Sequence, residues 1–237
     1  MESTRSIQSP KQGFSAGAAI CYDLWLRFRD ASSEVEAEEV IGLLVACTLA
    51  PAHAEEALWL ADVLTQTAFS QRPGRVESTI LLLTKAANVL SDRVPAAEVT
   101  AREFLATSLV KAGRIDDALA AYRRAVDLSY VCGPIETRLL DLPRICSLMR
   151  KLGRFADLAD VAKELHREAQ TAGRRTSVLV AYEYLGEALE GLGDWAEVLA
   201  LAELERPIAL EGSGPNTTML LDAIEQRVAR ARAALGA

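Results

Sequence analysis

Apolar residues recur at steps of three and four along almost the whole chain, and no run shows sustained strict alternation. In TAREFLATSLVKAG, Phe104, Leu105, Leu109 and Val110 share one face, and the pattern stops at Gly113, a residue that closes a helix without steric cost. The next segment, RIDDALAAYRRAVDL, starts at once with acidic residues in its first turn. Two amphipathic helices joined by so short a turn pack antiparallel, which predicts a helical hairpin.

The same punctuation returns at fixed spacing, because Gly113, Gly153 and Gly193 each follow the previous one by 40 residues. Stepping backward gives weaker matches near Gly74 and Ser33. One hairpin cannot bury its own apolar face, so we predict an all-α solenoid in which stacked hairpins complete one another. The predicted parts are a flexible tail over 1–13 and a single repeat domain over 14–237, with hairpins over about 14–50, 52–91, 97–131, 135–171 and 175–208 and a capping helix over about 216–236.

Pro143 interrupts the first helix of the fourth predicted hairpin. Proline lacks the amide donor and clashes with the preceding turn, so it predicts a break or a kink there. The alternative is a separate short helix or turn before Pro143, which shortens the main helix to about 142–152.

Small residues recur where the helices of a hairpin must approach closely. The third hairpin has Ala106, Ala118 and Ala125 with Tyr122, the fifth has Tyr182, Leu185 and Gly186 in YEYLGEAL, and the fourth has Cys146, Leu158 and Ala162. In these residues the chain resembles the tetratricopeptide-repeat (TPR) proteins. The resemblance implies a right-handed superhelical stack, and the spacing of 40 residues, against about 34 in the classical repeat, implies longer helices.

The resemblance also implies a concave face, lined by the first helix of each hairpin, as the site where a partner peptide or helix binds. The pattern of Lys and Asn with which chaperone-binding members hold a peptide's carboxylate is absent, so we do not expect that clamp. The candidate residues of the concave face are Glu103, Thr107, Lys111, Arg144, Ser147, Arg150, Lys151, Glu183, Glu187 and Glu190.

Basic residues concentrate in the middle of the chain, ahead of an acidic stretch. Arginine forks there are suited to a carboxylate-rich or phosphorylated partner, and the alternative is a solvated face whose charges pair between adjacent repeats. The basic cluster consists of Arg123, Arg124, Arg138, Arg144, Arg150, Lys151 and Arg154.

The terminal hairpin has no preceding repeat to cover its outer face. Tyr22, Trp25, Leu26 and Phe28 therefore form a candidate apolar interface edge for a second copy or a partner, unless the N-terminal tail covers them. Trp59 and Trp195 are expected to lie in the core. His53 with Cys47 is too isolated to indicate a metal site, and among the four cysteines Cys132 is the one expected to be exposed.

The net charge of −7 disfavours direct binding to nucleic acid or to an anionic bilayer. No nucleotide-binding loop, nucleophile elbow or paired cysteine motif occurs, so we expect neither catalysis nor a cofactor. We expect a cytoplasmic adaptor that binds a protein or peptide and does not insert into a membrane, with self-association as a further option. The alternative function is a regulatory sensor that binds a small molecule or a signalling peptide.

Overall fold

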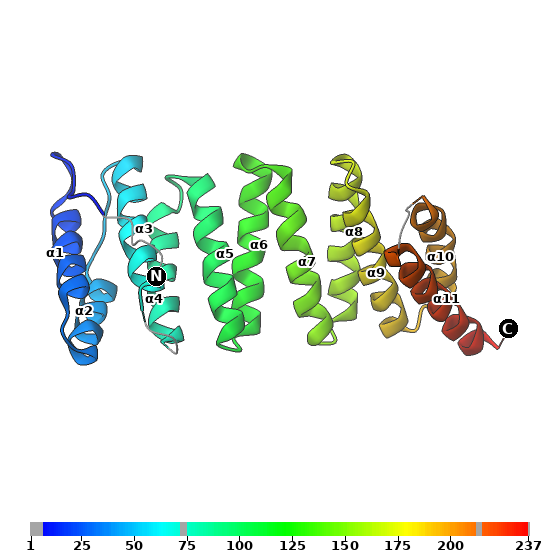
Figure 1. Ribbon diagram of the computed structural model, residues 1–237. Helices are drawn as coiled ribbons and strands as arrows, with labels where there is room; N and C mark the ends of the chain where they lie inside the picture. Colours follow the sequence, from blue (N-terminus) through cyan, green and yellow to red (C-terminus); the bar gives the residue numbers. More distant parts are fainter. Residues whose placement is uncertain (1–6, 72–74, 212–214, 237) are drawn as a thin grey trace. The chain divides into compact units, whose positions relative to one another are not determined.

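A computed structural model describes residues 7–71, 75–211 and 215–236, and the described residues form helices and connecting turns with no strand. Consecutive helices pair as antiparallel hairpins (Figure 1), as the hydrophobic pattern predicts. The chain divides into two compact units, residues 1–133 and 134–237.

The first unit contains three hairpins, each made of two consecutive helices that pack against each other. The second hairpin contacts both the first and the third. The helices are α1 (Ala16–Asp30), α2 (Glu34–Ala46), α3 (Ala54–Phe69), α4 (Val76–Leu90), α5 (Pro95–Lys111) and α6 (Ile115–Cys132).

The second unit contains two hairpins and a last helix that packs on the second of them. The helices are α7 (Ile135–Lys151), α8 (Phe155–Thr171), α9 (Arg175–Leu192), α10 (Trp195–Leu210) and α11 (Pro215–Leu235). The helix bounds agree with the five hairpins and the capping helix that the sequence predicts.

The glycines that are spaced by 40 residues end their helices as predicted. Gly113, Gly153 and Gly193 have φ of +75°, +67° and +75°, a region that favours glycine. After Gly113, the amide of Arg114 donates to the carbonyl of Leu109 at 2.9 Å, which is the bond of a Schellman cap. The same cap recurs after Gly153 and Gly193, and it lets the next helix begin immediately. Ser33 caps the start of α2, whereas the turn predicted at Gly74 lies outside the described residues.

Pro143 does not break its helix. The helix α7 continues through Pro143 from Ile135 to Lys151, so the separate short helix is wrong. Leu142, Ile145 and Cys146 are almost fully buried on this helix, and their packing offsets the hydrogen bond that proline cannot donate.

The small residues behind the TPR resemblance lie where helices touch. Ala106, Ala118 and Ala125 are fully buried, and Tyr122 is only 4% exposed. On α9, a Cβ at Gly191 would lie 2.3 Å from the ring of Phe155 on α8. Glycine at this position is therefore required by the close approach of the two helices.

The buried carboxylate of Glu56 ties the start of α1 to the start of α3. It accepts hydrogen bonds from the amide of Ser15 at 2.9 Å, from the Ser15 hydroxyl and from the amide of Ala52 at 2.8 Å. His53 caps α3, because its Nδ1 accepts from the amide of Glu56 at 3.2 Å. Burial acts to raise the pKa of Glu56, but these hydrogen bonds outweigh it and lower the pKa below its usual value.

The described part of the predicted tail, residues 7–13, packs against α3. Ile7 is buried, and the indole nitrogen of Trp59 donates to the carbonyl of Gln8 at 3.0 Å. Lys11 forms an ion pair with Glu55. Trp59 and Trp195, expected in the core, are each only half-buried.

The substitution Glu56→Gln is expected to lower the free energy of unfolding by about 1–3 kcal/mol at neutral pH, because it weakens hydrogen bonds to a charged acceptor. The wild-type carboxylate stabilises the fold above its unfolded pKa of about 4.3, and this contribution disappears as the pH falls through the lower folded pKa. Urea unfolding at neutral and acidic pH measures the difference. The exposed neighbour variant Glu55→Gln is the control, and an equal loss in both variants would contradict this role of Glu56.

The substitution Gly191→Ala is expected to destabilise the protein by about 1 kcal/mol, because the clash with Phe155 exceeds the gain in helix propensity. The control is Gly42→Ala on α2, where a Cβ meets no atom within 4 Å. That variant should gain about 0.5–1 kcal/mol. Thermal unfolding of both variants tests the opposite signs.

Candidate partner-binding surface

Three of the predicted concave-face residues lie on one side of α9. Glu183, Glu187 and Glu190 are spaced by four and three residues, so successive turns of the helix place them in a row. Glu183 is exposed, and the other two are half-buried. This acidic row is the part of the predicted site that the second unit displays most clearly.

The acidic row is tied to α7 by Arg150. Its Nη1 atom donates to the two carboxylate oxygens of Glu187 at 3.0 and 3.2 Å, and its guanidinium carbon lies 5.4 Å from the centre of the Tyr184 ring. Arg150 therefore bridges two neighbouring hairpins, through a charge pair and a cation–π contact.

The acidic row faces α11 on its other side. Arg230 donates from Nε and Nη2 to the two oxygens of Glu190 at 2.8 and 3.1 Å. A groove of about 430 Å³ lies between α9 and α11, with the glutamates on one wall. The opposite wall includes Met219, which is 71% exposed, and Leu220. The groove thus combines carboxylates with an accessible apolar side chain.

A buried ion pair anchors α11 beneath this groove. Arg227 donates to Glu205 on α10 at 2.7 Å, and both side chains are at most 5% exposed. A Cβ at Gly186 would lie 2.4 Å from Arg227, so a glycine on α9 makes room for the guanidinium. Burial raises the pKa of Glu205, and Arg227 opposes that rise.

The remaining predicted residues have separate surroundings. On α7, Arg144 pairs with the buried Asp141 at 2.7 Å, Ser147 is half-buried and Lys151 is exposed. On α5 of the first unit, the Thr107 hydroxyl lies 2.9 Å from the Glu103 carbonyl and 3.1 Å from the Tyr122 hydroxyl, and Lys111 is exposed. Thr107 therefore joins the two helices of its own hairpin.

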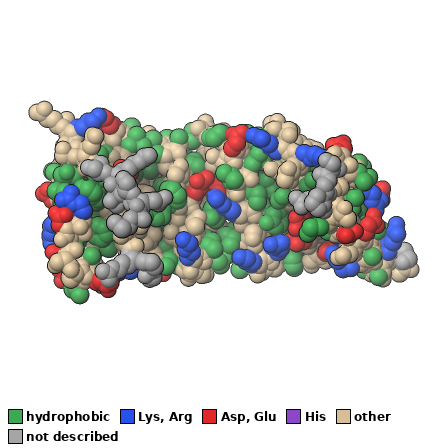
Figure 2. Space-filling view, in the orientation of Figure 1, with side chains coloured by type: hydrophobic (Ala, Val, Ile, Leu, Met, Phe, Trp, Pro, Cys, Tyr) green, Lys and Arg blue, Asp and Glu red, His purple; other side chains and the backbone are tan. Residues whose placement is uncertain are grey.

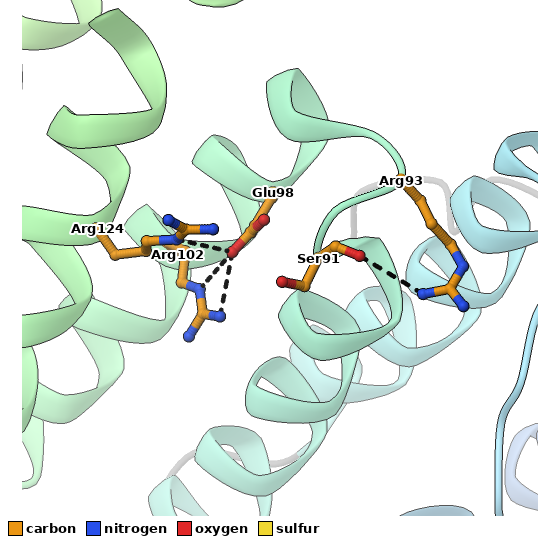
Figure 3. Close-up of polar contacts among 5 residues, drawn as sticks. All are labelled: Ser91, Arg93, Glu98, Arg102 and Arg124. Atoms are coloured by element: carbon orange, nitrogen blue, oxygen red, sulfur yellow. Dashed lines mark hydrogen bonds and ion pairs between the residues drawn. The ribbon is translucent and has the colours of Figure 1, made fainter. Parts of the chain in front are cut away.

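Most arginines of the predicted basic cluster have carboxylate partners. Arg124 shares the buried Glu98 with Arg102, and Figure 3 shows both guanidinium groups directed at one oxygen of that carboxylate. Acidic and basic side chains are interspersed over the face seen in Figure 2. This is the arrangement expected of charges that pair between helices. The pairs are Arg124–Glu98, Arg138–Glu168, Arg144–Asp141, Arg150–Glu187 and Arg154–Asp157.

The predicted apolar edge on α1 is largely covered at its centre. Trp25 is only 8% exposed, and its ring stacks on Tyr22 with centroids 5.8 Å apart. The guanidinium of Arg29 lies 5.4 Å from the Trp25 ring. Tyr22, Leu26 and Phe28 are half-buried.

Metal ligation and thiol chemistry have little support in the described part of the chain. There, no three His, Cys, Asp or Glu side chains are grouped in a way that could hold a metal ion. Cys132 is exposed as predicted, while burial raises the pKa of both Cys21 and Cys146 to about 12. None of the helices within the described ranges has the length and apolar character to cross a bilayer.

The sequence pattern left the role of α11 at the groove unrecognised. Met219, Leu220, Arg227 and Arg230 were assigned only to a capping helix. One signal was present: Arg230 follows Glu190 by 40 residues, the same spacing as the turn glycines. Residues one repeat apart occupy equivalent positions on neighbouring units of a stack, and here they form an ion pair.

No protein-family model matches this chain, and neither does any curated protein. Among solved structures, BtubC (BKLC) from P. vanneervenii is 17% identical, with 94% of this chain and 89% of that chain covered and a TM-score of 0.52. TPR-like repeats from Podosopora anserina, of a protein assigned as a kinesin light chain, are 17% identical over 80% of this chain and 95% of that chain, with a TM-score of 0.48.

At this level of identity, the likeness to solved structures concerns the fold. The chain has the fold of a TPR-like helical-repeat protein, which confirms the resemblance drawn from its small residues and turn glycines.

The substitution Arg227→Met is expected to destabilise the protein by about 3–5 kcal/mol at neutral pH, because it leaves the charge of Glu205 buried and unpaired. The double variant Glu205→Leu with Arg227→Met should lose much less. The single variant should regain stability as the pH falls through the raised pKa of Glu205, because the folded state then binds a proton more tightly than the unfolded state. Urea unfolding at two pH values tests this, and equal losses in the single and double variants would contradict it.

Proposed function

We propose that the protein is an interaction scaffold that binds a partner peptide or helix on the face formed by α7, α9 and α11. The groove between α9 and α11 is the observation that carries this proposal. TPR-like repeats present such faces without catalytic machinery, because stacking the hairpins leaves one helix of each pair accessible.

The charges of the groove indicate the partner's chemistry. Glu187 and Glu190 are paired with Arg150 and Arg230, whereas Glu183 is exposed and forms no ion pair within the described residues. Glu183 is therefore available to a lysine or arginine of the partner. The exposed Met219 beside it offers an adaptable apolar contact. A segment that combines one basic and one apolar side chain fits this surface.

The test is affinity capture with the intact protein and the double variant Glu183→Lys with Met219→Lys. Both side chains are exposed, so the fold should be retained. The matched control is Asp160→Lys with Leu204→Lys, which changes an exposed acidic and an exposed apolar residue on α8 and α10 outside the groove.

The groove variant should lose at least about tenfold in affinity for the captured partner, which is the size of effect expected for central contact residues. The control variant should bind like the wild type. A partner that both variants retain equally would contradict the proposal. Light scattering on the same samples shows whether a second copy of this chain is the partner.

A small-molecule sensor is the second candidate function. It is favoured by a cavity in the first unit that is separate from the groove.

A further inference from the structure

A cavity of about 500 Å³ lies in the first unit beside the turn that joins α1 to α2. Its walls come from the end of α1, the start of α2, the end of α3 and the residue that precedes α4. The volume falls within the range of about 300–1,000 Å³ that is typical of small-molecule sites. The first hairpin is also less tightly packed than the second and third.

The apolar side of the cavity is rigid and partly aromatic. Trp25, Phe28 and Ile41 line it, and Trp25 is held in place by its contacts with Tyr22 and Arg29. Ala37, on the second turn of α2, lines the cavity with a methyl group only. The space therefore persists because a small residue stands where a larger one would fill it.

The arginines at the cavity are neutralised by neighbouring carboxylates. Arg75 pairs with Glu38 at 2.9 Å and lies 3.7 Å from Glu34. Arg29 pairs with Asp30 through two hydrogen bonds of 2.7 and 3.0 Å. The cavity thus has no uncompensated positive charge to select an anion, and the chemistry favours a neutral occupant.

One polar group at the cavity lacks a partner. Gln71 lines the wall, and its Oε1 atom is shielded from solvent without a hydrogen bond. The amide nitrogen donates only a long bond of 3.4 Å to the carbonyl of Ala68. Rotation about the terminal torsion of glutamine is soft, so the oxygen can turn to a donor placed in the cavity. A shielded acceptor without a donor is costly, and a ligand N–H removes that cost.

We propose that this cavity is a binding site for a small neutral molecule with a flat apolar body and one hydrogen-bond donor, which packs against Trp25 and Phe28 and donates to Gln71. The site lies in the first unit and does not depend on partner binding at the groove of the second unit. Its occupant would make the protein a ligand-responsive scaffold.

Indole and 1-methylindole are the probes for this proposal, because they share a flat ring and only indole has an N–H donor. Binding is measured on the full chain by calorimetry and by amide shifts in NMR spectra. Indole should bind saturably at millimolar concentration, and more tightly than 1-methylindole by about threefold to tenfold, the effect of one neutral hydrogen bond. The shifted amides should lie in the turn between α1 and α2 and at the end of α3.

Two variants separate the parts of the proposal. Ala37→Phe should abolish binding of both probes by filling the cavity, and Ala31→Leu in the turn is a second filling variant if α2 is disturbed. Gln71→Met should lower the affinity for indole to that for 1-methylindole, while Gln170→Met on an exposed position of α8 should change nothing. Absence of indole binding, or binding that persists in both filling variants, would overturn the proposed site. Equal affinity of the two probes would overturn the role of Gln71.

Discussion

The close approach of helices at alanine and glycine positions is the constraint on which the rest of this structure depends. Ala106, Ala118 and Ala125 are fully buried between helices, and neither Gly186 nor Gly191 has room for a Cβ. Because helices that touch at such positions lie close together, longer side chains interdigitate around each contact. The same closeness places Arg227 against α9 and so helps to shape the groove beside α11.

Buried carboxylates fasten helices to one another at several points. Glu98 joins α5 to α6 through Arg124, Glu205 joins α10 to α11 through Arg227, and Glu56 joins the starts of α1 and α3 through hydrogen bonds. A buried charge without partners costs several kcal/mol, so each of these groups disfavours packings that would separate it from its donors. The pairs therefore give the repeats a defined register in addition to their apolar contacts.

The two candidate sites differ in chemistry. The groove of the second unit is open and lined by the acidic row of α9, which suits a partner segment with a basic and an apolar side chain. The cavity of the first unit is lined by aromatic residues and paired charges, which suits a neutral ligand. Each site is built from residues that the TPR-like fold does not require, since the turn glycines and small contact residues already account for the hairpins.

The sequence by itself determined the helices and their turns, because both depend on local features. The spacing of apolar residues identified each hairpin, and Gly113, Gly153 and Gly193 marked helix ends that a left-handed residue closes. It also placed the acidic row on one helix face. Only the tertiary structure decided which charges meet, as in Arg150 with Glu187 and Glu190 with Arg230, and that Trp25 is covered. These outcomes depend on how helices distant in sequence face one another and on the conformations of long side chains, which periodicity does not specify.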